Sequence, residues 1–174
     1  MDIKRDILPY KDTMYRLALR ITLNSPEAED VVQDVIIKVW RQSQSSTGVQ
    51  IENMAAYLLR LTRNLSIDRQ RMKANQTESL DAMMSGEDGE HLVSTDAAQA
   101  ERRAFVAERL SLVRRVMEGL PEKQRTAMQL RDFEGKTYKE IAAIMEITEE
   151  QVKVNIFRAR QAVKQQVDSS SLPL

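Results

Sequence analysis

The chain has 174 residues, no cysteine and one histidine, and its 26 basic side chains balance 26 acidic ones. The lack of cysteine excludes disulfides and thiolate metal sites, and the lone His91 excludes a histidine-based catalytic or metal cluster within one chain. Few glycines, prolines and aromatics, with 42% hydrophobic residues, predict an all-α protein with a packed core. We expect a soluble, cytoplasmic protein without membrane insertion, because no signal peptide or membrane-length apolar run is present.

The net charge of zero conceals three blocks. Residues 1–73 carry 12 basic and 9 acidic side chains, residues 74–100 carry none and 6, and residues 101–174 carry 14 and 11. The middle block lacks a helical period, which predicts a flexible acidic linker. As a random coil it would span about 30 Å, and about 90 Å when extended, so it could hold two basic domains apart on one long ligand. The alternative is a disordered loop without a function.

Three or four helices are predicted in the first basic block, and three of them are placed over residues 6–23, 25–41 and 53–72. Ser25 is expected to cap the second helix, because a proline and several acids follow it within the first turn. Asn53 is expected to cap the third helix, after a polar loop.

The second helix carries neighbouring carboxylates, Glu29, Asp30 and Asp34, away from its wide apolar stripe. No histidine or second acid-rich helix completes a metal site. A solvated acidic face, able to dock a basic partner surface, is therefore the favoured interpretation.

The third helix separates an apolar core face from a row of cations. Arginines in such a row suit contacts to nucleic-acid phosphates, and Asn64 and Asp68 suit hydrogen bonds to unstacked bases. An ordinary solvated basic face is the alternative. The cations of this row are Arg60, Arg63, Arg69 and Arg71.

The second basic block begins with helices predicted over residues 101–118 and 121–132. A segment typical of a helix-turn-helix follows over residues 137–160, and the last six residues are expected to fray. Its two helix starts are marked by capping-box spacing, eleven residues apart, so only one short helix fits between them. The boxes pair Thr137 with Glu140 and Thr148 with Gln151.

The turn of this segment contains Glu146, where glycine would suit a positive φ angle. If the turn has that geometry, the glutamate costs about 1 kcal/mol. The following helix presents charged side chains that suit the major groove of duplex DNA. Any pair of short amphipathic helices shares this pattern, so the segment alone does not establish DNA binding.

Several short sequences, in order, resemble those of bacterial sigma-70 family factors of the extracytoplasmic-function (ECF) group. The first half contains AEDVVQD at 28–34, KVW at 38–40, AYL at 56–58 and RNLSIDR at 63–69. The second contains LP at 120–121, QR at 124–125, FEGKTYKEIA at 133–142, VK at 152–153 and RAR at 158–160. Each is a weak match alone, whereas their order and spacing together are specific.

The resemblance implies two small helical domains: sigma region 2 over residues 1–73 and sigma region 4 over 101–168, with the linker at 74–100 and a tail at 169–174. In this family the acidic helix docks on the clamp helices of the RNA polymerase β′ subunit, and region 4 meets the β flap. The implied docking residues are Glu29, Asp30, Gln33, Asp34 and Trp40.

Two contacts with promoter DNA are implied as well. Region 2 would recognise and melt the −10 element through Arg60, Arg63, Asn64, Asp68, Arg69 and Arg71. The helix-turn-helix would read the −35 element through Thr137, Lys139, Thr148, Glu150, Gln151, Lys153, Arg158 and Arg160. The acids at 146, 149 and 150 depart from the family pattern, so the −35 sequence cannot be read from this helix.

The expected function is promoter-specific transcription initiation, without cofactor or enzymatic activity, in response to stress or envelope signals and under an anti-sigma factor. A stand-alone helix-turn-helix repressor would leave the acidic helix and residues 63–69 unexplained. A nuclease would need a metal or nucleophile set, and the sequence offers no credible one. The sequence leaves the arrangement of the two domains in the free protein open.

Overall fold

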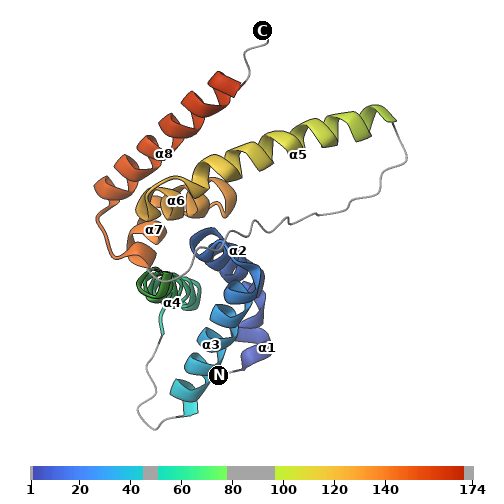
Figure 1. The fold of residues 1–174 in the computed structure, drawn as a ribbon. Helices are drawn as coiled ribbons and strands as arrows, with labels where there is room; N and C mark the ends of the chain where they lie inside the picture. Colours follow the sequence, from blue (N-terminus) through green and yellow to red (C-terminus); the bar gives the residue numbers. More distant parts are fainter. Residues whose placement is uncertain (1, 45–50, 78–96, 171–174) are drawn as a thin grey trace.

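The computed structural model describes residues 2–44, 51–77 and 97–170 (Figure 1). These residues form helices joined by turns, and no strand occurs among them, which confirms the all-α class. His91 and most of the predicted linker lie outside the described residues. Within the described ranges, no helix combines the length and apolar character that crossing a membrane requires.

The N-terminal half contains α1 (Ile3–Asp6), a 3₁₀ turn η1 (Leu8–Tyr10), α2 (Lys11–Thr22), α3 (Ser25–Gln44) and α4 (Met54–Thr77). The single helix predicted over residues 6–23 is wrong, because the chain changes to a 3₁₀ turn at Pro9. Proline has no backbone N–H to continue the helical hydrogen bonds. Helices α2, α3 and α4 pack against one another around a buried apolar core.

Side-chain caps set the starts of α3 and α4. Asn24, and not Ser25, caps α3: its Oδ1 accepts a hydrogen bond of 2.9 Å from the amide of Glu27. The Ser25 hydroxyl lies 2.8 Å from the hydroxyl of Tyr15 instead. The prediction was one residue late because both neighbours have side chains that can cap a helix. Asn53 caps α4 as predicted, accepting 2.9 Å from an amide three residues on.

The C-terminal half contains α5 (Ala97–Glu118), α6 (Glu122–Met128), a π-helical turn η2 (Gln129–Phe133), α7 (Tyr138–Met145) and α8 (Glu149–Ser170). Both ends of the predicted linker are therefore helical, because α4 runs to Thr77 and α5 begins at Ala97. Helix α8 runs two residues into the segment expected to fray.

The two halves pack against each other in what we term the closed arrangement. Helix α4 contacts α7, and α2 contacts both α6 and η2 (Figure 1). Leu58 and Leu59 of α4 belong to the same buried cluster as Ile141 and Ile144 of α7. A smaller cluster around Met117 joins α5 to α6 and α8. The domain arrangement that the sequence left open is thus a shared apolar core.

Candidate nucleic-acid and polymerase interfaces

Both predicted capping boxes are present in the helix-turn-helix. Thr137 Oγ1 accepts from the amide of Glu140 at 3.1 Å, and Glu140 Oε2 accepts from the amide of Thr137 at 2.7 Å. Thr148 and Gln151 repeat the pattern at 3.2 and 3.0 Å. The hydrogen bond from the Thr137 amide lowers the pKa of Glu140, because it stabilises the charged carboxylate. The boxes fix where α7 and α8 begin.

The turn between α7 and α8 has the geometry that makes its glutamate unfavourable. Glu146 has φ 57° in the left-handed region, and its amide donates to the carbonyl of Ala142. A β-carbon in this conformation costs about 1 kcal/mol or more. The Glu146 carboxylate lies 3.8 Å from Arg60 of the other half, and both side chains are half-exposed. Such a pair contributes less than about 1 kcal/mol, so it offsets the strain only in part.

Helix α8 buries Val152, Ile156 and Ala159 and turns a charged side outward. All eight residues predicted to read the −35 element are exposed. Three of them, Thr137, Thr148 and Gln151, also form the capping boxes, which leaves Lys139, Glu150, Lys153, Arg158 and Arg160. The Lys153 ammonium lies 5.7 Å from the ring centre of Tyr138. Arg158 has no ion-pair partner among the described residues.

Arg160 differs from the other predicted DNA contacts on α8. Its guanidinium donates twice to the carboxylate of Asp132 in η2, with Nε at 3.0 Å. These hydrogen bonds raise the pKa of Arg160. Arg160 therefore ties α8 to η2 and is less available to DNA than Lys153 or Arg158.

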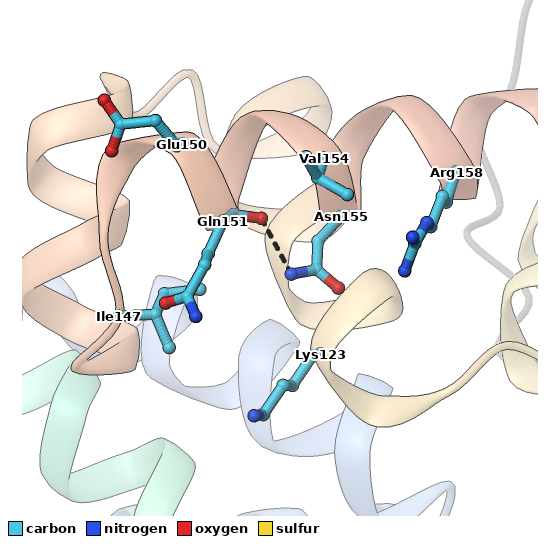
Figure 2. A pocket seen from close by; sticks show the side chains of 7 residues that line it. All are labelled: Lys123, Ile147, Glu150, Gln151, Val154, Asn155 and Arg158. Carbon is cyan, nitrogen blue, oxygen red and sulfur yellow. Dashed lines mark hydrogen bonds between the residues drawn. The ribbon is translucent and has the colours of Figure 1, made fainter.

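A groove of about 380 Å³ runs beside the first turns of α8 (Figure 2). Asn155 Nδ2 donates to the carbonyl of Gln151 at 2.8 Å along its wall. The groove adds Lys123 of α6 to the cations near α8, a residue that sequence reasoning missed because only the packing of α6 on α8 brings it there. Its lining residues are Lys123, Ile147, Glu150, Gln151, Val154, Asn155 and Arg158.

The predicted docking residues lie on the exposed side of α3. Glu29, Asp30, Gln33, Asp34 and Trp40 are all exposed. Ile37, 44% exposed, lies between the acids and Trp40, which is 45% exposed. The sequence pattern could have identified Ile37, because it is an apolar residue next to the buried stripe of α3. This face combines carboxylates with two large apolar side chains, which suits a protein partner. No group of acids that could hold a metal occurs among the described residues.

Two predicted docking acids form ion pairs with a predicted DNA contact. Arg69 of α4 donates from Nη2 to Asp34 Oδ2 at 2.5 Å, and its Nη1 lies 3.7 Å from Asp30 Oδ2. Lys73, one turn further along α4, pairs with Glu27 of α3. Ion pairs thus line the boundary between the docking face and the end of α4.

Arg63, predicted to contact the −10 element, is buried between the halves with 7% exposure. Its Nε and Nη2 donate to the two carboxylate oxygens of Glu122 on α6, at 3.0 and 2.9 Å. The Thr126 hydroxyl donates to the same carboxylate at 2.8 Å. The other residues of the predicted row are more accessible: Arg60, Asn64 and Arg69 are partly exposed, and Asp68 and Arg71 are exposed.

A second bridge of the same design crosses between the halves. Arg16 of α2 donates to both oxygens of Glu134, at 2.7 and 2.8 Å, and Gln129 donates to that carboxylate at 3.1 Å. The Glu134 side chain is only 5% exposed. Two-pronged arginine–carboxylate contacts fix orientation as well as distance, so the closed arrangement is specified by polar geometry as well as by apolar burial.

Comparisons with known proteins identify both halves. The family profile described as Sigma-70 region 2 matches residues 7–76, and that of Sigma-70, region 4 matches residues 110–163. The RNA polymerase sigma-H factor of Pseudomonas aeruginosa is 30% identical over 162 residues, which cover 90% of this chain and 81% of that protein. The ECF RNA polymerase sigma factor SigW of Bacillus subtilis is 30% identical over 161 residues, covering 91% and 84%. The chain belongs to the ECF group of the sigma-70 family.

Solved structures share the fold of this sigma factor. The sigma factor RpoE of Bartonella quintana, in complex with the anti-sigma factor NepR, aligns with a TM-score of 0.70 over 96% of this chain and 97% of that one, at 22% identity. CnrH, in complex with the cytosolic domain of CnrY, aligns with a TM-score of 0.61 over 95% and 86%, at 18% identity. The family regions place the α3 face and the α4 row in region 2, and the helix-turn-helix in region 4.

Proposed function

We propose that this sigma factor docks on core RNA polymerase through the outer face of α3 and brings the enzyme to promoters contacted by α4 and α8. The observation that carries the proposal is that one chain presents both a helix-turn-helix and the exposed Asp30, Asp34 and Trp40. A repressor would need only the helix-turn-helix. The polymerase supplies the chemistry, and the complex acts in the cytoplasm.

Reconstitution with purified core RNA polymerase tests this proposal. The protein should co-elute with core polymerase and permit initiation at a defined set of start sites, found by sequencing the transcripts. Failure to bind core polymerase would refute the proposal. Asp34→Arg should weaken core binding at unchanged helix content, whereas Asp12→Arg, the same change on exposed α2 surface, should not.

We further propose that the closed arrangement is the polymerase-free form and that promoter binding requires the halves to separate. Support comes from Arg63, which cannot reach DNA while Glu122 holds it between the halves. Because the chain has no cysteine, single cysteines introduced at the exposed Met72 and Gln165 would accept spectroscopic labels selectively. The distance between the labels should lengthen in the holoenzyme, and an unchanged distance would contradict the proposal.

Control by an anti-sigma factor is proposed on the likeness to the Bartonella quintana sigma factor, which was solved with one. An exposed apolar strip on α5, formed by Phe105, Val106 and Leu110, is a surface suited to such a partner. A protein that co-purifies with this chain should lower transcription from the reconstituted holoenzyme in proportion to the amount added. A co-purifying protein that leaves transcription unchanged would count against this assignment.

A further inference from the structure

The ion pair between α3 and α4 lies where two proposed binding faces meet. Arg69 is 27% exposed in its side chain, and its two partners are more open, Asp34 at 52% and Asp30 at 65%. The two acids are four residues apart on α3 and therefore one above the other on the helix. One guanidinium is thus shared by two carboxylates that project into solvent.

The partners of this pair belong to different functions. Asp30 and Asp34 lie on the face proposed to dock on polymerase, and Arg69 belongs to the row proposed to contact −10 DNA. We infer that the Arg69–Asp34 ion pair couples polymerase docking to DNA binding, so that each event favours the other. This inference rests on the proposed function, because it needs both faces to bind what is proposed for them.

The coupling follows from competition for the same charges. A basic surface of the polymerase that takes up the carboxylates of Asp30 and Asp34 removes the partners of Arg69. The freed guanidinium is then available to a DNA phosphate, which it binds in a two-pronged geometry. By linkage, DNA that takes up Arg69 frees the acids for the polymerase to the same extent. Exposed ion pairs of this kind change an equilibrium constant by up to about fivefold.

The neighbouring pair of Lys73 and Glu27 provides an internal control. It also joins α3 to α4, and it lies one turn beyond Arg69. Glu27 is only 21% exposed and is not part of the docking face. Neutralising Lys73 removes the same charge from nearly the same place, and its ion-pair partner Glu27 is not a docking acid.

The first test is a double-mutant cycle on the free, full-length protein. The probe is a fluorescent 25-nucleotide single-stranded DNA at low salt. Asp30→Asn with Asp34→Asn should raise DNA affinity by about fivefold. The same change in an Arg69→Gln background should raise affinity clearly less, because only general charge repulsion is then relieved. Equal increments in both backgrounds, or no increment in either, would overturn the inference.

The second test measures affinity for core RNA polymerase. Arg69→Gln should tighten core binding by up to about fivefold relative to Lys73→Gln, because it leaves the docking acids without an internal partner. A purely structural arginine would have the opposite effect, since its loss would weaken binding. Equal affinities of the two variants would overturn the coupling alone. Failure of the unmodified protein to bind core polymerase would instead refute the proposed function, so the two failures are distinguishable.

Discussion

The two proposed DNA-contacting surfaces differ in how far carboxylates of the chain itself engage their cations. On α4, Arg63 and Arg69 are engaged by carboxylates of the chain itself. On α8, Lys153 and Arg158 face solvent beside an open groove. The acids that engage the two α4 arginines, Glu122 of α6 and Asp34 of α3, would compete with DNA phosphates for them, whereas Lys153 and Arg158 have no such competitor among the described residues. Closure, through the contact of Glu122 with Arg63, therefore restrains the proposed −10 contact more than the proposed −35 contact, a difference that the sequence does not show.

Removing Glu122, the acid that holds Arg63, should have the largest effect on the difference between the two surfaces. Glu122→Ala leaves an arginine buried between the halves with no partner, which should destabilise the closed arrangement by about 3 kcal/mol. Label-to-label distances should lengthen in the free protein, and its affinity for single-stranded DNA should rise. Glu146→Gln is the control, since its pair with Arg60 spans 3.8 Å and is half-exposed. A compact Glu122→Ala variant with unchanged DNA affinity would show that Glu122 does not restrain this surface.

The α8 surface should respond to charge removal without any opening. Lys153→Ala and Arg158→Ala should each weaken duplex binding by the free protein and reduce the slope of log K against log salt by about 1. Arg103→Ala removes the same charge from the exposed side of α5 and should leave the slope nearly unchanged. Salt titrations of duplex binding by fluorescence anisotropy measure both. A slope unaffected by either α8 substitution would exclude groove contact by this helix.

Features set by neighbouring residues were predictable from the sequence. The two capping boxes and the Asn53 cap depend on side chains within four residues of one another, and all are present. The turn geometry considered for Glu146, a positive φ angle, is present as well. The error at Ser25 arose between two adjacent residues that can both cap a helix. The sequence therefore predicted the helix α3 correctly but placed its capping residue one position too late.

Features set by residues distant in sequence were not predictable. Glu122 lies 59 residues from Arg63, and Glu134 lies 118 from Arg16. Nothing in the spacing of these residues distinguishes a cation that faces DNA from one that joins two domains. The packing of the two halves decides it, because it brings Glu122 of α6 onto Arg63 of α4.

Substitutions of Glu146 compare the strain of the turn with the contact that Glu146 makes to Arg60 of the other half. Glu146→Gly relieves the left-handed strain but removes the contact to Arg60, so it should stabilise the protein by up to about 1 kcal/mol and raise Tm by up to about 4 °C. Glu146→Gln keeps the β-carbon and should not stabilise. Thermal unfolding measured by circular dichroism compares the two. A loss of stability in the glycine variant would mean that the Arg60 contact outweighs the strain.

The smallest expected effect is a difference in pH dependence between the two capping boxes. They share the same geometry, but one contains a glutamate and the other a glutamine. Glu140 titrates, and the amide of Thr137 lowers its pKa below the ordinary value of 4.5, so folding favours the charged form. Its contribution to stability is therefore complete above the ordinary pKa and is lost as pH falls through the lowered one. Gln151 has no such dependence. Glu140→Gln should flatten the decline of Tm below about pH 5, and Gln151→Glu should steepen it. Parallel declines in all three proteins would show that the Glu140 carboxylate is not stabilised by its box.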